Sequence, residues 1–488
     1  MRPTVSFLDR VLLERIVSEA RSVLCTLGVE IHNPGVVSML SDHGATVRAD
    51  RDRVFLTEDI MDRALKTAPR GFRLYDALGR TAHELEGDRV HFTTGSAAIS
   101  VLDHDTLASR PPTTADYVAY AKIVAQLPSI AFQSTAIVPG DVPQNIADSY
   151  RLYLSLLLGE KPVVTGAFTI DAFTVMRDLQ IAVRGTLEEL RAKPLTIFSC
   201  CPSAPLKWSD VTSQNLVDCA LHGIPVEYIS MPLTGFVAPV TLVGSLVQHT
   251  AETLSGVVIS QLTSPGAPAL WGGSPAVFDI RYETTPMGAA ETMMIDCAAS
   301  EIGKHLGLPT QAYMGLSDAK LLDGQAGLET SMGATLAALA GINSVSGPGM
   351  LDFESCFSLE KLVLDNEICG LALRLVRGIE PRDDFPAIPL FEELLREKHL
   401  LIADHTRRYL KLEHYFPGAA IDRANHSRWQ AEGSRTLGAR AHEEVGRLLA
   451  GYRPSALPDD VKAELTRLMA REARRYGMDT LPHGRLAP

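Results

Sequence analysis

Short runs of apolar and β-branched residues alternate in the middle of the chain with longer segments whose apolar positions recur at helical spacing. The alternation begins near Phe92, ends near Arg374 and comprises eight pairs, and most of the short runs end in Gly, Pro, Ser or Asp. A strand followed by an amphipathic helix is the repeating unit of parallel β/α folds. Eight such units that close on themselves form a (β/α)8 TIM barrel, so the pattern predicts this α/β fold, with functional residues after the strands.

The predicted strands are His91–Val101, Ile130–Val138, Pro162–Phe168, Pro194–Cys201, Ile224–Met231, Ala269–Gly272, Thr310–Met314 and Ile342–Ser346. The predicted helices between and after them are Thr114–Gln126, Pro143–Leu158, Asp171–Arg191, Ser209–His222, Ser245–Leu262, Gly288–Leu306, Gln325–Leu339 and Ser358–Arg377. Threonine, serine and proline at several of these starts are typical of helix N-termini.

The chain of 488 residues is longer than a single barrel of roughly 250 residues, so we expect additional elements at both ends. Residues 1–90 are predicted to form a helical extension, residues 91–378 the barrel, and residues 379–488 a second helical extension. The N-terminal part also contains a predicted hairpin, Thr46–Leu56, that turns at Asp50–Asp52. Three prolines, Pro381, Pro386 and Pro389, punctuate the segment after the barrel.

The composition is that of an ordinary water-soluble protein, with 46% hydrophobic residues and no apolar run near the ~18 residues that span a bilayer. The first residues mix charged and apolar side chains and do not predict a signal peptide. A net charge of −12 without a basic cluster argues against nucleic-acid binding. Seven cysteines without a CxxC motif are expected to be reduced, so we expect a cytoplasmic protein.

The spacing of the cysteines and histidines along the chain does not predict a metal site. Cys200 and Cys201 are the only close cysteine pair, and neither an H-x-C nor an H-E-x-x-H motif accompanies them. Small buried residues at a strand end explain the pair better than zinc does, so we expect no metal ligands in this chain. The chain also lacks the G-x-S-x-G motif of a serine nucleophile. Without a convincing nucleophile of its own, the chain is expected to use one that is supplied from outside.

Glycines follow the sixth, seventh and eighth predicted strands, at Gly272–Gly273, Gly315, Gly324, Gly327 and Gly347–Gly349. They do not form a P-loop or a dinucleotide-binding motif. Two explanations stay open, and both can hold at once. Glycine allows turns that other residues resist, and a rim of small residues also lets a large group approach the barrel mouth.

Polar and aromatic residues at the predicted strand ends are the candidate substrate-binding groups. They are Gln133, Glu227, Tyr228, Trp271, Tyr313 and Asp318. Aromatic rings bind quaternary cations through their faces, and a carboxylate supplies a counter-charge. Each residue alone is more simply explained by packing or helix capping. Together they predict a cation-binding pocket at the barrel mouth.

Several segments resemble the trimethylamine methyltransferase superfamily. They are Glu19–Glu30, Met231–Gly235, Thr241–Leu254, Trp271–Pro275, Ser317–Lys320, Asp323–Glu329 and His405–Tyr409. The resemblance implies a TIM barrel that moves a methyl group from an amine nitrogen to the cobalt of a separate corrinoid protein. The partner would dock over the barrel mouth, and its Co(I) would be the missing nucleophile. This chain would then hold no tightly bound cofactor of its own, and a homo-oligomer stays open.

The trimethylamine enzymes of that family carry pyrrolysine, whereas this chain contains only standard residues. Removing a methyl group from a neutral tertiary amine expels an amide-like anion unless the nitrogen is first activated. A quaternary ammonium leaves as a neutral amine. We therefore expect a quaternary, betaine-type amine as the substrate, such as glycine betaine, proline betaine or carnitine.

Three alternatives remain. The chain could be a trimethylamine methyltransferase proper. It could be a non-catalytic barrel that binds a betaine or the corrinoid protein as a sensor or scaffold. A lyase or aldolase on the same barrel would need a Schiff-base lysine or metal-binding carboxylates at the strand ends, and Lys320, in a loop, is a poor candidate.

Overall fold

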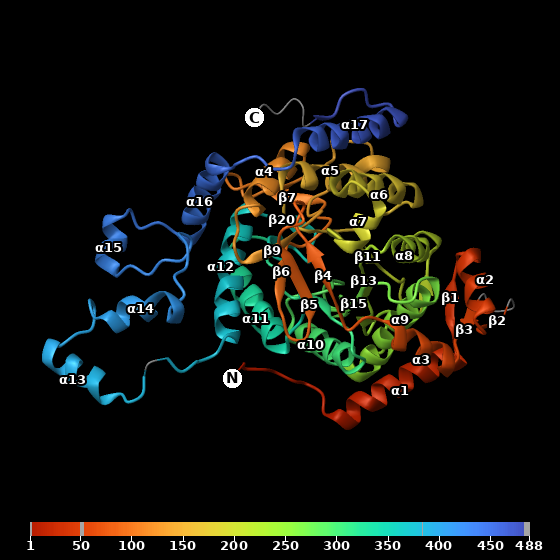
Figure 1. Ribbon diagram of the computed structural model, residues 1–488, viewed down its shortest axis with the longest axis horizontal. Helices are drawn as coiled ribbons and strands as arrows, with labels where there is room; N and C mark the ends of the chain where they lie inside the picture. The colour runs from red at the N-terminus through yellow and green to blue at the C-terminus, as the bar shows by residue number, and fades with distance from the viewer. Residues whose placement is uncertain (1, 49–52, 383, 483–488) are drawn as a thin grey trace.

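The centre of the molecule is a parallel eight-stranded barrel (Figure 1), seen in a computed structural model that describes residues 2–48, 53–382 and 384–482. Its strands in chain order are β6 (His91–Thr93), β9 (Ile130–Ser134), β10 (Val163–Thr165), β11 (Thr196–Cys200), β13 (Val226–Ser230), β15 (Ala269–Gly273), β17 (Gln311–Tyr313) and β18 (Ser344–Ser346). A parallel bridge between Trp271 and Thr310 joins β15 to β17 and closes the ring. The predicted fold class is confirmed.

Each barrel strand is followed by a helix that covers the outside of the ring. In chain order these are α4 (Thr114–Val124), α5 (Ala147–Leu158), α6 (Ile170–Arg184), α8 (Asp210–His222), α9 (Leu242–Thr263), α10 (Ala290–His305), α11 (Gly324–Ala340) and α12 (Leu359–Val376). Most begin at a capping side chain, as at Thr169, Ser209 and Asp323, which accept hydrogen bonds from the first turn. The main apolar core lies between these helices and the strands.

Several predicted elements are shorter in the structure, and two of them differ most from the prediction. The first strand was expected to run to Val101, but β6 ends at Thr93. A β-carbon on Gly95 would lie 2.0 Å from the Met350 side chain, and Ala97 has a positive φ of 62°, so the chain turns out of the barrel here. The predicted helix Asp171–Arg191 is divided into α6 and α7 (Leu187–Ala192) because Gly185 adopts a φ of 92° and Thr186 caps a new helix.

An antiparallel hairpin closes the N-terminal end of the barrel. It consists of β4 (Gly71–Tyr75) and β5 (Ala82–Glu86). Leu74 and Leu85 on the hairpin are fully buried against a layer of apolar side chains from the strands, namely Phe132, Val164, Ile197 and Leu270. This layer fills the lower half of the barrel, so polar chemistry inside the ring is confined to the C-terminal half.

Two strand pairs lie beyond the C-terminal ends of β18 and β6 and form one small sheet in the order β19-β20-β7-β8. Its members are β19 (Met350–Leu351), β20 (Cys356–Phe357), β7 (Ser100–Leu102) and β8 (Ser109–Arg110). We call it the rim sheet. A second pair, β14 (Leu233–Thr234) and β16 (Ala276–Val277), connects the loops after β13 and β15.

The N-terminal elements are α1 (Arg10–Thr26), β1 (Val29–Ile31), α2 (Pro34–Asp42), β2 (Thr46–Arg48), β3 (Arg53–Phe55) and α3 (Glu58–Thr67), and β1 also pairs with β12 (Lys207–Trp208). Helices α1 and α3 pack on α9. The strands β2 and β3 pair as an antiparallel hairpin, while its predicted turn, Asp50–Asp52, lies outside the described residues.

The C-terminal elements are α13 (Ile388–Glu397), α14 (Asp404–Glu413), α15 (His426–Ala431), α16 (Leu437–Gly451) and α17 (Asp459–Arg475). Helices α16 and α17 return to the barrel and pack on its outer helices, whereas α13 and α14 project away from it (Figure 1). Within the described part of the chain, none of the helices is long and apolar enough to cross a membrane.

We predict that Leu85→Ala destabilises the fold by about 2–5 kcal/mol, because it leaves a cavity beneath the closed end of the barrel. Urea denaturation followed by circular dichroism measures this difference. Arg73→Ala on the same hairpin is the matched control. Arg73 forms an exposed ion pair with Glu84 at 2.9 Å, so its loss should cost no more than about 1 kcal/mol. Equal effects of the two substitutions would show that Leu85 does not stabilise the closed N-terminal end of the barrel.

Candidate functional site

The C-terminal half of the barrel interior contains a group of buried polar side chains, which we call the interior polar cluster. Its strand-borne members are Ser199 on β11, Glu227 on β13, and Gln311 and Tyr313 on β17. Ser199 donates a hydrogen bond of 2.6 Å to Glu227 Oε1, and the backbone N–H of Gly273 donates one of 3.1 Å to Gln311 Oε1. Glu227 is only 1% exposed. The cluster lies directly above the apolar layer that fills the lower barrel.

Glu354 completes the cluster from above, in the turn between β19 and β20 of the rim sheet. Asp352, Phe353 and Glu354 have positive φ values of 49°, 54° and 69°, and a run of such residues is unfavourable by roughly 1–2 kcal/mol for each non-glycine. Lys320 helps to hold the turn, with its Nζ 3.3 Å from a carboxylate oxygen of Asp352 and 3.9 Å from the centre of the Phe353 ring. Backbone strain of this kind is concentrated at functional sites.

Burial changes the acidity of both carboxyl groups. It raises the pKa of Glu227 to about 7, against the opposing hydrogen bond from Ser199. Burial also raises the pKa of Glu354 to about 8, and the charge of Glu227 adds to the increase. The pKa of Tyr313 is raised by burial first and then by the charges of Glu227 and Glu354, which shows that the three groups share one environment.

Three polar atoms of the cluster are buried and have no hydrogen-bond partner among the described residues: Glu227 Oε2, Glu354 Oε1 and Gln311 Nε2. Lysine and arginine are also absent, within the described chain, from the charges that act on the two carboxyl groups. A buried polar group without a partner costs about 1–3 kcal/mol, and a buried charge costs more. The cluster is therefore chemically suited to a cationic ligand that replaces the missing counter-charge.

The strands place the six predicted substrate-binding residues in three different positions. Glu227 and Tyr313 face the barrel interior. Asp318 lies on the loop after β17 and accepts hydrogen bonds from the backbone N–H groups of Met287 (2.9 Å) and Gly288 (2.8 Å). It joins two loops of the rim, and burial raises its pKa to about 6.

The other three predicted residues face outward, so the structure does not place them in the barrel. Gln133 donates to the backbone oxygens of Ser155 and Lys161 beside α5. The Tyr228 ring packs against Gly256 of α9, and the Trp271 ring packs against Gly303 of α10. The physical reason is the two-residue period of a strand, in which Tyr228 must face away from the side that Glu227 occupies.

Sequence reasoning missed Ser199, Gln311 and Glu354. A signal existed for Gln311, because it lies two positions before Tyr313 and therefore on the same face. The structure also explains the glycine opposite it, since a β-carbon at Gly272 would lie 2.4 Å from Gln311 Oε1. Glu354 comes from a turn, and strand periodicity cannot identify it.

One group of three side chains among the described residues could hold a metal ion: His104, Glu360 and His442. It lies outside the barrel, and its members are too far apart in sequence for a spacing rule to detect. The Nδ1 atoms of His442 and His104 lie 2.9 Å and 3.8 Å from Glu360 Oε1. However, the two imidazole rings are stacked at 3.8 Å and 7°, so their lone pairs lie in two parallel planes, which is unfavourable for two ligands of one ion. The geometry fits a hydrogen-bonded cluster better than a metal centre.

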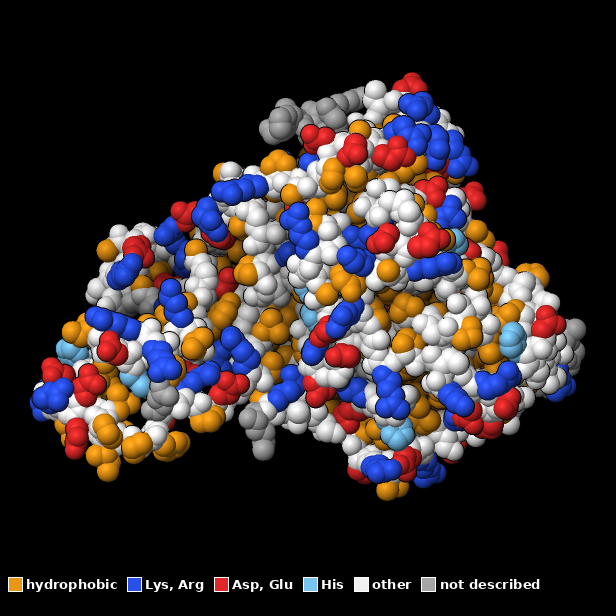
Figure 2. All heavy atoms as spheres, in the orientation of Figure 1, with side chains coloured by type: hydrophobic (Ala, Val, Ile, Leu, Met, Phe, Trp, Pro, Cys, Tyr) orange, Lys and Arg blue, Asp and Glu red, His pale blue; other side chains and the backbone are white. Residues whose placement is uncertain are grey.

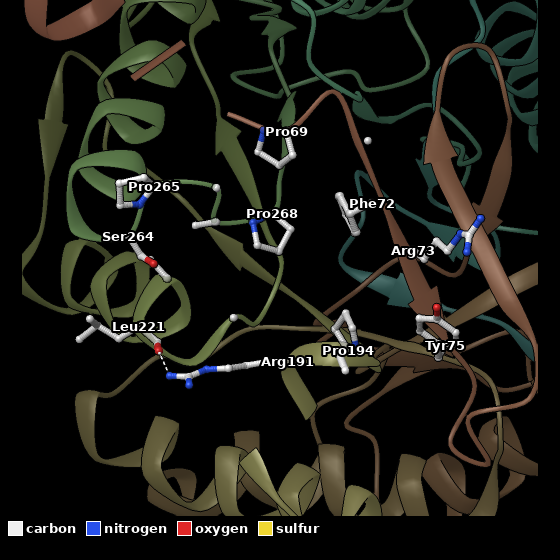
Figure 3. Close-up of a pocket in the computed structure, with 16 residues that line it drawn as sticks. Pro69, Phe72, Arg73, Tyr75, Arg191, Pro194, Leu221, Ser264, Pro265 and Pro268 are labelled. Atoms are coloured by element: carbon white, nitrogen blue, oxygen red, sulfur yellow. Dashed lines mark hydrogen bonds between the residues drawn. The ribbon is translucent and has the colours of Figure 1, made fainter. Parts of the chain in front are cut away.

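A hollow of about 730 Å³ lies at the opposite end of the barrel from the interior polar cluster (Figure 3). Pro69, Pro194 and Pro268 line it from segments that precede strands, and Arg191 beside it donates a 2.7 Å hydrogen bond to the Leu221 backbone oxygen. Active sites of TIM barrels lie at the C-terminal ends of the strands. This hollow therefore does not compete with the interior polar cluster as the functional site.

Comparisons with known proteins agree on one family. A family model described as trimethylamine methyltransferase (MTTB) matches residues 1–477. The trimethylamine methyltransferase MttB of Desulfitobacterium hafniense (strain DSM 10664 / DCB-2) is 28% identical over 456 residues, which are 93% of this chain and 92% of that protein. The glycine betaine methyltransferase of D. hafniense (strain Y51) is 27% identical over 477 residues, which are 97% and 98% of the two chains.

Solved structures support the fold. The monomethylamine methyltransferase MtmB of Methanosarcina barkeri aligns with a TM-score of 0.53 and 12% identity, over 97% of this chain and 88% of that one. Its complex with hydroxylamine aligns with a TM-score of 0.54 and the same identity, over 92% and 89%. At this identity the likeness concerns the architecture alone.

We predict that Glu354→Gly yields a protein that is more stable than Glu354→Ala by about 1–2 kcal/mol. Both variants lose the buried carboxyl group, but only glycine relieves the left-handed backbone conformation. Chemical denaturation of the two variants measures the difference, and the common loss of the side chain cancels. An alanine variant as stable as the glycine variant would show that the turn is not strained.

Proposed function

The chain belongs to the trimethylamine methyltransferase family and is a methyltransferase. From this premise we propose that it removes a methyl group from a quaternary amine and transfers it to the Co(I) of a separate corrinoid protein. The observation that carries the proposal is the interior polar cluster, in which two buried carboxyl groups lack a cationic partner.

A quaternary ammonium group complements this cluster. It supplies one permanent positive charge, so it can compensate an ionised Glu227 or Glu354 in a site from which water is excluded. The Tyr313 ring adds a π face, and a cation on such a face is stabilised by roughly 0.5–2 kcal/mol. Because Trp271 and Tyr228 lie outside the barrel, Tyr313 is the one member of the predicted aromatic set that can do this.

The side chains of the cluster do not offer a good nucleophile. Ser199 donates its hydroxyl hydrogen to Glu227, but it does not lie in the G-x-S-x-G motif of a serine nucleophile. Burial raises the pKa of the nearby Cys201 thiol to about 12, so that thiol stays protonated. These observations favour a nucleophile that enters with a partner. The role of this chain is then to bind the cation, exclude water and orient one N-methyl group toward the acceptor.

The substrate class rests on the leaving group. When the C–N bond of a quaternary amine breaks, the electron pair stays on nitrogen and a neutral amine leaves, without a proton donor. A neutral tertiary amine needs prior activation, and the 488 standard residues of this chain do not include pyrrolysine. A relative named for glycine betaine supports a betaine-type substrate.

The test mixes the full-length protein with a chemically reduced corrinoid protein or free cob(I)alamin and follows methylation by absorption spectroscopy. Glycine betaine, proline betaine, carnitine, choline and trimethylamine are compared as donors. We expect at least one quaternary amine to react and trimethylamine to react little or not at all. Trimethylamine turnover at or above the rate of every quaternary amine would refute the substrate class. Binding of a quaternary amine without any methyl transfer would favour a sensor.

Substrate affinity should increase as the pH rises through about 7, because Glu227 becomes ionised there while the quaternary ammonium keeps its charge at every pH. Calorimetric titration between pH 6 and pH 8.5 measures this. Glu227→Gln should lower the affinity by about 10–150-fold at pH 8, as expected for a lost bond to a charged group worth roughly 1.5–3 kcal/mol.

Ser199→Ala is the matched variant for this experiment. It removes the hydrogen bond that lowers the pKa of Glu227, so it should move the midpoint of the pH profile upward while the carboxyl group remains. An affinity that is independent of pH in the unmodified protein would exclude Glu227 as the counter-charge.

A further inference from the structure

The C-terminal extension contains a projecting segment, residues 384–412, that we call the arm. It includes α13 and most of α14 and extends away from the barrel (Figure 1). None of the α13 residues is buried, and Tyr409 is the one buried residue of α14. The arm is thus a folded segment that has almost no core of its own.

The exposed side chains of the arm are unusually apolar. Eight large hydrophobic residues are exposed there, namely Phe385, Ile388, Phe391, Leu395, Leu401, Ile402, Leu410 and Leu412. Ile388, Phe391 and Leu395 are 70%, 58% and 68% exposed and form one stripe along α13, at the spacing of a helix that buries a face. Hydrophobic side chains gather at the outer end of this region in Figure 2.

The exposed apolar area of the arm is as large as the area that one partner contributes to a protein–protein interface. At on the order of 100 Å² for each large apolar side chain, eight of them offer about 800 Å², the usual contribution of one partner to a stable complex. The largest apolar patch of a typical monomeric protein is smaller, at roughly 300–600 Å². The arm also has no net charge, with five acidic residues (Asp384, Glu392, Glu393, Glu397, Asp404) and five basic ones (Arg396, Lys398, Arg407, Arg408, Lys411). Association through it would depend on apolar burial.

The same chain carries a second apolar surface that the arm could cover. Leu328 and Met332 lie one turn apart on α11, and Leu371 and Leu375 lie one turn apart on α12. All four are exposed, and the two helices pack side by side. We call this surface the α11–α12 face.

The arm does not cover its own α11–α12 face, because its base is fixed. Glu413 binds Arg382 through its carboxylate at 2.7 Å and Arg374 through its backbone oxygen at 2.9 Å. These contacts hold both ends of the arm near the C-terminal end of α12, and the arm leaves in a direction away from the barrel (Figure 1). A second chain can supply the missing cover.

We propose that the arm of one chain packs on the α11–α12 face of a second copy of this chain, so that the protein is a homo-oligomer with exchanged arms. A corrinoid protein is the other conceivable occupant, but the position of the arm argues against it. Helix α12 starts just after β18, at the mouth of the barrel, and ends at the opposite side. The arm is therefore rooted far from the mouth. A partner that leaves after each transfer also uses a smaller and more polar surface than this one. The inference does not depend on the proposed function.

The first experiment measures the oligomeric state of the full-length chain by sedimentation equilibrium. We expect an oligomer at micromolar concentration. Phe391→Asp/Leu395→Asp, and separately Leu371→Asp/Leu375→Asp, should raise the concentration of half-dissociation by at least about 30-fold, as for central interface residues. Glu393→Gln/Arg396→Gln on the same helix is the control and should leave it unchanged. Circular dichroism verifies that every variant is folded.

A second experiment shows which surfaces meet. Leu395→Cys chains are mixed with Leu371→Cys chains under mild oxidation. A disulfide-linked pair should form in the mixture and exceed what either variant, or the unmodified chain with its seven cysteines, gives alone. The proposal would be overturned if the chain is a monomer at all concentrations. It would also be overturned if the oligomer stays intact in both double-aspartate variants. A third result would also overturn it: the chain is a monomer, and its arm variants lose methyl transfer to a corrinoid protein but keep it with free cobalamin. The arm would then be the binding surface for the corrinoid protein.

Discussion

The burial of two carboxyl groups without a cation is the constraint on which the rest of the site depends. Glu227 and Glu354 lie above the apolar lower half of the barrel, and no lysine or arginine of the described chain is among the charges that act on them. Buried acids on the outer helices are of two kinds: Asp296 on α10 and Glu252 on α9 also lack a cation, whereas others form ion pairs. Asp365, for example, is paired with Lys361 at 2.6 Å, and Asp148 with Arg151 at 2.6 Å. Glu227 and Glu354 are distinguished by lying together inside the barrel, where the charge of one acts on the other, and such a pair is suited to receive a positive charge.

The way in which Glu354 reaches the cluster supports the same interpretation. A carboxyl group on a barrel strand would need no unusual backbone. Glu354 instead depends on three consecutive residues in the left-handed region, held by Lys320 and by the rim sheet. Selection for stability alone would favour glycine in such a turn. The persistence of side chains there is explained if the Glu354 carboxyl group is needed inside the barrel.

The sequence predicted the barrel well because strand and helix periodicities differ and because the alternation repeats eight times. It predicted poorly whether a single strand side chain points into the barrel or out toward the helices. An error of one position exchanges the inside and the outside of a strand, and the fully buried strands of a barrel are apolar on both sides, so their pattern does not reveal the parity. Glu227 and Tyr228 illustrate this, since both are buried and only the first is inside. The tail was correctly expected to be helical, but amphipathicity alone does not tell whether the apolar face of α13 meets its own barrel or another chain.

The paired carboxyl groups also account for how a charged substrate could leave after it has reacted. With pKa values of about 7 and 8, the two groups together carry roughly one negative charge near neutral pH, because the ionisation of one opposes that of the other. One quaternary ammonium ion matches that charge. Under the proposed reaction, loss of the methyl group converts this ion into a neutral amine inside the barrel. The electrostatic attraction between the carboxyl groups and the substrate then disappears at the moment of transfer. The negative charge of the carboxyl groups is again buried without a counter-charge. Binding would thus be strong for the methyl donor and weak for its product, and the same electrostatic imbalance that selects the substrate would release what remains of it.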